Sequence, residues 1–447
     1  MRVLLVHPGT GRLANPHAFP PWGAITTATS LRADAIDADV VDLNGRDISE
    51  ALPRLLEDYR PDALGVTGKM GLAAERALQT AAVAKKWDSR IRVVLGGPVV
   101  DSFGPEIERR WTDFDAFLPG DGEAGLVEWV TQGCPSGLRP VARFQDLDRA
   151  GIPGWWSALR EYVGPAEVRP GLDVPSLHVA SSRGCTGNCR FCYLSNPGRA
   201  RGLEYVSSSR LVSDLELISE RFGATGFFFV DDCFLDASGC RLASIEACLS
   251  PRSDMRFGCD LQLWQLADQR LLERLATLGF RSFYVGLEAG STAVCRNLGK
   301  RQPVEGKCMV IRRALDDGFV IRSSVGVGWP GETEEDIADT FDLLTALPEM
   351  KIDAFRYTPL PHAPLTDDYI RAGGSVPSVE EWPFLDFCFR SRNFSGLPDE
   401  VHEAAWESLI AVQDERHGLV SMGGDLVSRS EYDRADSQSR PIWTAGE

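Results

Sequence analysis

The chain has 447 residues, of which 43% are hydrophobic and 25% are charged. This composition is typical of a soluble protein with a large core, and the length suffices for two or three domains. The net charge of −17 argues against a nucleic-acid or anionic-membrane surface, because such a chain repels phosphate groups at long range.

Targeting and redox signals indicate a reducing compartment. The N-terminus "MRVLLVHPGT" has an apolar stretch too short for a secretory signal, and no apolar run reaches eighteen residues. The eleven cysteines all fall at or after Cys134 and do not form an extracellular disulfide framework. We therefore expect a cytoplasmic protein whose thiols serve metal binding or packing, with no membrane or nucleic-acid partner.

The first 133 residues alternate between strand and helix patterns. Five short apolar runs, "RVLLVHP", "ADVVDLNG", "ALGVTG", "RVVLGG" and "DAFLPG", are separated by stretches with helical spacing. This alternation predicts a five-stranded, doubly wound (Rossmann-like) domain. Its functional edge is expected at the carboxyl ends of the strands, where the loops 69–71, 96–99 and 120–123 meet.

A linker and a second alternation follow. Proline and glycine punctuate residues 134–175, which predicts a linker. Residues 176–365 contain six strand patterns joined by helical segments, which predicts a partial (β/α)6 barrel of parallel strands, and residues 366–447 predict a small helical cap with a polar tail. Polar residues end several of the barrel strands, where ligands bind in such folds; they are Asp231, Asp232, Glu288, Ser323 and Ser324.

The segment "GCTGNCRFCYL" carries three cysteines in a CxxxCxxC spacing, at Cys185, Cys189 and Cys192. A structural zinc site needs four ligands, and no second cysteine pair or histidine knuckle follows at suitable spacing, so zinc is disfavoured. Three thiolates suit a four-iron cluster with one iron left open for another ligand. The alternative is three buried cysteines that serve packing only.

The triplet, with Phe191 before its last cysteine, resembles the radical S-adenosylmethionine (radical SAM) superfamily. Further segments resemble the branch of that superfamily with an N-terminal cobalamin-binding domain, over about residues 2–360. In the barrel they are "FVDDCF", "FYVGLEAGS", "NLGK" and "VGVGWPGETEEDIADT"; in the first domain they are "PPWGAITTATSLR", "VVLGGP" and "PGDGEAGLVEWV".

The resemblance implies that Cys185, Cys189 and Cys192 hold a 4Fe-4S cluster. It also implies that the backbone around Phe191 and Tyr193 meets the adenine of S-adenosylmethionine.

The polar strand ends gain roles from the same resemblance. Asp231 and Asp232 are expected to accept from the methionine ammonium, a charge-assisted bond, and the alternative is a solvated acidic pair. Glu288 is expected to bind the ribose hydroxyls, and the alternative is a salt bridge to an arginine such as Arg322. Ser323 is expected at the same cosubstrate edge.

The segment "GWPGETEED" has two interpretations. The resemblance assigns Trp329 and Pro330 to adenine contacts, whereas Thr333 and Asp336 form a variant of a capping box that starts a helix. Both can hold. Cys233 and Cys259 could point into the barrel, although buried cysteines mostly act as small hydrophobic residues.

In the first domain the resemblance implies a cobalamin site. Gly96 and Gly97, followed by Pro98, allow close approach of the corrinoid's nucleotide tail. The corrin amides are expected to meet Gly120, Asp121, Gly122 and Glu123, and the loop with Lys69 and Met70 shares the same edge. The DxHxxG motif that supplies a histidine to cobalt is absent, so the cobalt is expected to lack that ligand; the alternative is a vestigial domain.

The resemblance implies an enzyme that methylates an unactivated carbon of a small molecule, such as a natural-product precursor in secondary metabolism. A 5'-deoxyadenosyl radical would abstract hydrogen, methylcobalamin would deliver the methyl group, and a flavodoxin or ferredoxin would supply electrons. One alternative is radical rearrangement, cyclisation or heteroatom exchange. Another is a non-catalytic iron-sulfur sensor. A lid over the cavity is a further expectation, with candidate aromatics Trp382, Phe384, Phe387 and Trp406.

Overall fold

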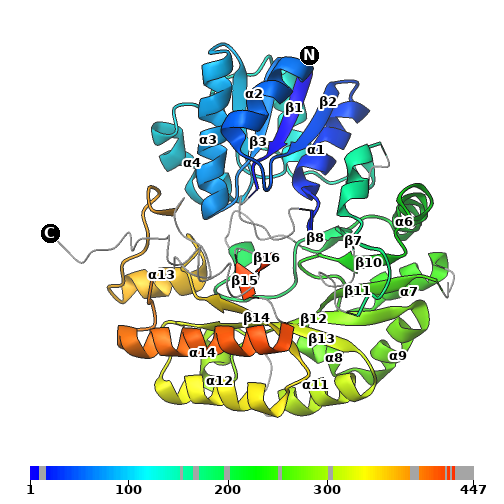
Figure 1. Ribbon diagram of the computed structural model, residues 1–447, viewed down its shortest axis with the longest axis vertical. Helices are drawn as coiled ribbons and strands as arrows, with labels where there is room; N and C mark the ends of the chain where they lie inside the picture. The colour runs from blue at the N-terminus through cyan, green and yellow to red at the C-terminus, as the bar shows by residue number, and fades with distance from the viewer. Residues whose placement is uncertain are drawn as a thin grey trace.

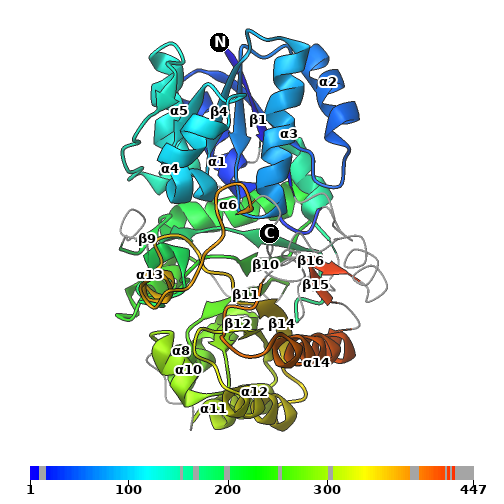
Figure 2. The ribbon, with the colours of Figure 1, turned by 90° about the vertical axis from the view of Figure 1, so that its left-hand side faces the viewer.

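The computed structural model contains two parallel sheets of six strands each, one above the other (Figures 1 and 2). It describes residues 1–9, 17–151, 155–164, 171–195, 202–249, 254–300, 306–382, 392–417, 420–422 and 425–427. A Rossmann-like sheet is followed by a half-barrel, which confirms the predicted fold class. Within the described residues, no helix is long and apolar enough to cross a membrane.

The first sheet has the strand order β2-β1-β3-β4-β5-β6. Its strands are β1 (Arg2–His7), β2 (Asp37–Asp42), β3 (Ala63–Thr67), β4 (Arg92–Gly96), β5 (Ala116–Leu118) and β6 (Gly137–Leu138). Residues on both faces of these strands are buried, as expected for a parallel sheet with helices on both sides.

Helices cover both faces of the first sheet. One face packs on α1 (Trp22–Ala33) and α5 (Gly122–Thr131), and the other on α2 (Ile48–Tyr59), α3 (Leu72–Trp87) and α4 (Pro98–Arg110). Asp47 starts α2 by accepting hydrogen bonds from the backbone of Ser49 and Glu50.

The sixth strand, β6, lies inside the predicted linker and was not predicted from the sequence. It has two residues in a Pro- and Gly-rich stretch, too short to produce a strand pattern. The segment that follows is also packed rather than extended: the 3-10 helices Leu147–Ala150 and Ser157–Tyr162 bury Trp156, Leu159 and Tyr162 in the larger core.

The second sheet has the order β14-β13-β12-β11-β10-β7, so each strand neighbours the next one along the chain. Its strands are β7 (Ser176–Val179), β10 (Gly226–Phe229), β11 (Arg256–Leu261), β12 (Phe280–Glu288), β13 (Val320–Val327) and β14 (Lys351–Arg356). A short hairpin, β8 (Ser182–Arg183) with β9 (Glu204–Tyr205), lies beside β7.

Helices cover the outer face of the half-barrel (Figure 1). They are α6 (Ser208–Phe222), α7 (Cys240–Cys248), α8 (Leu263–Leu266), α9 (Gln269–Leu278), α11 (Lys307–Asp316) and α12 (Glu334–Ala346). Helix α10 (Thr292–Asn297) instead buries Val294 and Cys295 in a smaller core with Trp329. Leu272, Leu275 and Leu278 form the buried stripe of α9, and Asp268 caps its first turn.

The C-terminal region is partly integral to the half-barrel. It contains α13 (Pro364–Arg371), α14 (Asp399–His417) and the strands β15 (Val420–Met422) and β16 (Asp425–Val427). Helix α14 packs along β14, where it buries Trp406, and its Gln413 side chain accepts a hydrogen bond from the Ala354 backbone at 2.7 Å. Gln413 thereby satisfies a donor on the edge strand of the sheet.

Candidate active site between the two sheets

A cavity of about 590 Å³ lies at the carboxyl ends of the first-domain strands, facing the half-barrel. Its walls come from the ends of β1, β3, β4 and β5 and from the starts of α1 and α5. Arg183 and Val230 of the half-barrel complete it, so both sheets contribute to one space. This is the edge at which doubly wound sheets bind ligands.

Seven of the predicted first-domain residues line this cavity: Lys69, Gly96, Gly97, Pro98, Gly120, Gly122 and Glu123. Met70 instead packs against the core on the α2–α3 side, and Asp121 is buried outside the lining. Position 97 requires glycine, because its φ is 98° and a Cβ there would lie 2.6 Å from the Gly68 carbonyl oxygen.

Several lining residues were not singled out from the sequence. Among them are His7, Phe19, Trp22, Asn44 and Arg183. Burial, with Lys69 and Arg76 nearby, lowers the pKa of His7 to about 3, so its imidazole is neutral at pH 7. The quoted "PPWG" segment was the available signal for Trp22.

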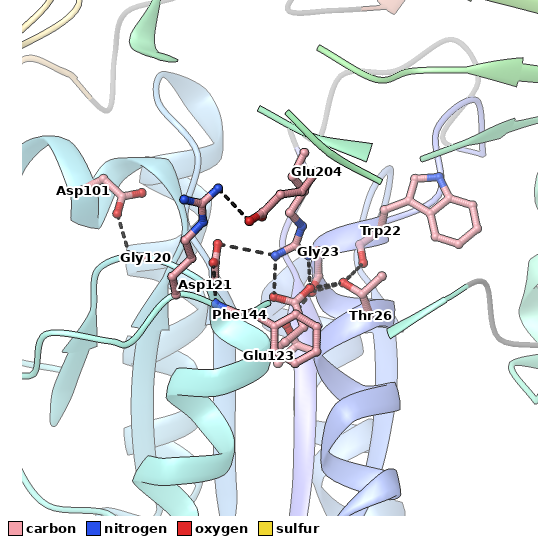
Figure 3. Close-up of polar contacts among 12 residues, drawn as sticks. Trp22, Gly23, Thr26, Asp101, Gly120, Asp121, Glu123, Phe144 and Glu204 are labelled. Carbon is pink, nitrogen blue, oxygen red and sulfur yellow. Dashed lines mark hydrogen bonds and ion pairs between the residues drawn. The ribbon is translucent and has the colours of Figure 1, made fainter. Parts of the chain in front are cut away.

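Arg183, on β8, contacts two carboxylates of the first domain at the cavity wall. These carboxylates, Asp121 and Glu123, lie close together in Figure 3. Both terminal nitrogens of Arg183 donate to the Glu123 carboxylate, and one lies 3.4 Å from Asp121 Oδ1. The Thr26 hydroxyl also donates to Glu123, at 2.5 Å, and the Phe144 backbone donates to Asp121. Glu123 is only 3% exposed, so Arg183 neutralises a buried charge.

This network gives the predicted pair a structural role. The carboxylates of Asp121 and Glu123 accept from protein donors, which fixes the β5–α5 loop, and Glu123 also lines the cavity. Arg183 stands two residues before Cys185. The same contact therefore fixes the start of the cysteine loop against the first domain.

The cysteine triplet lies on the loop after β8, with all three side chains partly exposed. The Gly187 backbone donates to Cys185 Sγ at 3.2 Å. A Cβ built on Gly187 would lie 3.3 Å from Cys185 Sγ and 3.8 Å from Cys189 Sγ. A side chain at position 187 would thus crowd the space beside two of the thiols, which glycine leaves open.

The two aspartates after β10 have different environments. Asp231 is buried and accepts from the Ser181 backbone and hydroxyl, both at 2.6 Å, and from the Ser182 backbone at 2.7 Å. Burial raises its pKa to about 6. Asp232 is exposed, and the Tyr193 hydroxyl donates to it at 3.3 Å. Asp232 is therefore exposed at this edge, whereas Asp231 anchors the end of β7.

Glu288 pairs with a lysine rather than with Arg322. Lys300 Nζ lies 2.7 Å from Glu288 Oε1, and the Ser324 hydroxyl donates to Oε2 at 2.9 Å. Arg322 instead donates to Asp353. A register shift in β12 and a φ of 66° turn Glu288 out of the regular strand. Such a strained, buried carboxylate is typical of a functional site.

The alternation of β13 directs Ser323 away from this edge. Its side chain is buried on the outer face and donates to the Val285 carbonyl at 2.6 Å, so Ser324 and not Ser323 meets Glu288. Cys259 likewise lies on the buried outer face of β11, and Cys233 is buried with its thiol 3.3 Å from the Leu235 carbonyl oxygen.

A second, apolar cavity of about 250 Å³ adjoins the cysteine loop. Phe191 and Trp329 lie edge to face with ring centroids 5.2 Å apart, and Lys300 Nζ lies 5.9 Å from the Phe191 ring. Pro330 does not line it; its carbonyl accepts from Asn297. The lining residues are Phe191, Cys192, Tyr193, Trp329, Phe355, Tyr357, Thr358 and Leu360.

The predicted capping box is present at the start of α12, and a buried carboxylate, Glu332, directly precedes it. Thr333 and Asp336 cap α12 reciprocally, and the preceding Glu332 accepts from the Gly328 and Trp329 backbones at 2.8 and 3.2 Å. Burial raises the pKa of Glu332 to about 7. Glu332 therefore holds the turn that carries Trp329.

This raised pKa predicts a pH-dependent stability. An unfolded glutamate ionises near pH 4.5, but Glu332 keeps its proton in the folded chain until about pH 7. Its ionisation thus destabilises the fold increasingly as pH rises between these values. Urea titrations give the free energies of unfolding of Glu332→Gln and the wild type. We expect the difference between them to shift by about 3 kcal/mol in favour of the variant from pH 4.5 to pH 8. A constant difference would contradict this account.

Of the candidate lid aromatics, Trp406 is buried in the larger core and Trp382 packs on Phe103 of α4, with ring centroids 5.7 Å apart. Both serve packing. Phe384 and Phe387 lie outside the described residues.

Comparison with known proteins agrees with this arrangement. Residues 179–344, from β7 to α12, match the model of the radical SAM superfamily. The half-barrel of this chain is therefore a radical SAM domain. Among curated relatives of this radical SAM protein, an uncharacterized methyltransferase of Pyrococcus horikoshii is 24% identical over 369 residues, 76% of this chain and 77% of that protein. An anaerobic magnesium-protoporphyrin IX monomethyl ester cyclase of Rubrivivax gelatinosus is 24% identical over 395 residues, which are 82% of this chain and 69% of that protein.

Two solved structures share the fold of this radical SAM protein. The radical SAM methyltransferase TsrM from Kitasatospora setae, solved with tryptophan and a SAM analogue, has a TM-score of 0.65 and 17% identity over 83% of this chain and 76% of that one. The cobalamin-dependent radical enzyme OxsB, solved with aqua-cobalamin and S-adenosylmethionine, has a TM-score of 0.60 and 16% identity. The match covers 83% of this chain and 55% of OxsB. Both likenesses extend over most of this chain.

Proposed function

We propose that this radical SAM enzyme binds cobalamin and methylates an unactivated carbon of a small molecule. The observation that carries the proposal is the shared cavity: Arg183, two residues from the cluster loop, also lines the strand-end cavity of the first domain. A corrinoid in that cavity would therefore lie near the cluster.

The residues present fit both groups. Three thiols on one loop, with the space beside two of them kept open by Gly187, suit an iron-sulfur cluster. At the other site Gly96 leaves the cavity wall bare, because a Cβ there would meet only the Leu118 carbonyl oxygen, at 3.8 Å. When bound, the cluster with S-adenosylmethionine supplies a carbon-centred radical and the corrinoid supplies a methyl group.

The chain's own residues would bind and orient these groups. Asp232, which is exposed, would accept from the methionine ammonium, and Glu288, held by Lys300 and Ser324, would accept from the ribose hydroxyls. Phe191 and Trp329 would hold the adenine in the apolar cavity, which excludes water from the reacting atoms. A small flavodoxin- or ferredoxin-type protein would supply the electrons.

The experiment that tests methyl transfer requires no substrate. The protein, reconstituted with cluster and reduced cobalamin, is incubated with S-adenosylmethionine carrying a trideuterated methyl group. We expect the protein-bound corrinoid to gain the labelled methyl, as mass spectrometry would detect. An unlabelled corrinoid beside deoxyadenosine formation would contradict methyl transfer and favour rearrangement, cyclisation or heteroatom exchange. The absence of deoxyadenosine with an intact cluster would favour a sensor.

A further inference from the structure

The inner face of the half-barrel carries a row of side chains that are partly exposed. The two-residue alternation of buried and partly exposed residues is complete along β14 and holds over parts of β11, β12 and β13. The partly exposed residues are Phe228, Asp260, Tyr284, Gly286, Arg322, Ser324, Asp353 and Phe355. A surface of this kind can receive a ligand.

Four of these residues form a polar group across neighbouring strands. Asp260 of β11 is in register with Tyr284 of β12, which is in register with Arg322 of β13. Asp353 of β14 completes the group, since Arg322 donates to its Oδ1 through Nε at 2.9 Å and through a terminal nitrogen at 2.6 Å. Asp260 precedes the last residue of its strand, so the group lies on the strands and not on the loops that carry Asp232 and the cysteines.

Asp260 differs from Asp353, which Arg322 neutralises. In the described part of the chain it has no hydrogen-bond or ion-pair partner, and the same holds for the Tyr284 hydroxyl. The nearby cation, Arg322, is already engaged by Asp353. Burial and the carboxylates of Asp231, Asp232 and Asp353 raise the pKa of Asp260 well above its ordinary value.

A ligand with a positive nitrogen would satisfy this environment. An ammonium group donates charge-assisted hydrogen bonds to a carboxylate, and the neighbouring ring of Tyr284 offers a face that attracts cations. A carboxylate or phosphate ligand would add a further negative charge to the three that already surround Asp260. A neutral ligand would gain no charge-assisted hydrogen bond from Asp260.

The geometry points to a substrate that is a small amine, bound inside the half-barrel with its ammonium group against Asp260 and Tyr284. This inference rests on the proposed function for the identity of the reaction, but the binding itself requires neither corrinoid nor radical chemistry. Asp260 is then a substrate-positioning residue that sets the substrate class.

The test is amine binding to the cluster-loaded protein at saturating S-adenosylmethionine. The probes are tyramine, tryptamine and butylamine, each beside its N-acetyl derivative, which keeps the shape but loses the positive charge. The readout is the dissociation constant from the ligand-dependent shift in thermal unfolding. The variants are Asp260→Asn and, as a matched control, Asp342→Asn on the exposed side of α12.

We expect at least one amine to bind wild type and Asp342→Asn equally, and about ten- to hundredfold more weakly to Asp260→Asn. The N-acetyl derivatives should not bind. Equal binding of amines and N-acetyl derivatives, unchanged amine binding in Asp260→Asn, or no amine binding would each overturn the inference. Loss of the shift caused by S-adenosylmethionine alone in Asp260→Asn would also overturn it, because Asp260 would then serve the cosubstrate. Failure of the labelled-methyl experiment with amine binding intact would refute only the proposed function.

Discussion

Replacing Cys189 by alanine is expected to abolish both cluster binding and cleavage of S-adenosylmethionine. A cluster held by three thiolates has no spare protein ligand, so the loss of one removes a defined part of its coordination. The fold around Cys189 should survive, because its local contacts use the backbone: its carbonyl accepts from the Cys192 backbone at 3.1 Å and from the Ser195 hydroxyl at 2.7 Å.

The measurement is iron content after anaerobic reconstitution, together with deoxyadenosine production under dithionite. We expect less than about a tenth of the wild-type iron and no deoxyadenosine. Cys240→Ala is the matched control, because Cys240 is an exposed cysteine of the same half-barrel, on α7. Full iron content in Cys189→Ala, or equal losses in Cys240→Ala, would contradict the assignment of the triplet.

Replacing Arg183 by methionine is expected to lower the free energy of unfolding by about 3–5 kcal/mol. The variant leaves the Glu123 carboxylate, which is 3% exposed, without its arginine, and Thr26 alone cannot neutralise it. The magnitude follows from the burial of a charge that has lost its partner. Urea titration of the variant and the wild type measures the difference.

Two further variants separate charge burial from the loss of a side chain. The double variant Arg183→Met/Glu123→Gln removes both charges and should recover most of the lost stability. Arg274→Met, which breaks an exposed pair with Glu246 at 2.7 Å, should cost at most about 1 kcal/mol. If the double variant were as unstable as Arg183→Met, the arginine would act through packing, and the electrostatic account would be wrong.

The fold was predictable wherever patterns are periodic. Apolar runs that end in glycine or proline identified the strands, and the cysteine spacing identified the cluster loop, because both signals are local in the sequence. Strand β6 was not predicted, because two residues are too few to show a periodic pattern. The buried aromatics of the presumed linker, Trp156 and Tyr162, were hidden by the prolines and glycines around them.

Partners across the fold could not be predicted in the same way. The alternative to ribose binding for Glu288 was a salt bridge to an arginine such as Arg322. The register of β13 and β14 instead brings Arg322 to Asp353, and Lys300, on the loop after α10, reaches Glu288. Gly286 permits this pair, since a Cβ there would lie 2.5 Å from Glu288 Oε1. Such choices depend on tertiary register, which one sequence does not encode locally.

The two-residue alternation of β13 decides which serine side chain faces Glu288. Ser323 and Ser324 are adjacent, and only the alternation of β13 reveals that Ser324 faces Glu288. The role of Arg183 required both domains in contact, because its partners lie 60 residues earlier in the chain.

The most direct test of the account is a combined iron and cobalt count after anaerobic reconstitution with iron, sulfide and hydroxocobalamin. The account predicts about four irons and about one cobalt per wild-type chain. Gly96→Leu, which adds a side chain to the cavity wall at a position where the backbone accepts a Cβ, should keep the iron and lose the cobalt. Iron without cobalt in the wild type, or equal cobalt in Gly96→Leu, would contradict the claim that this cavity holds a corrinoid.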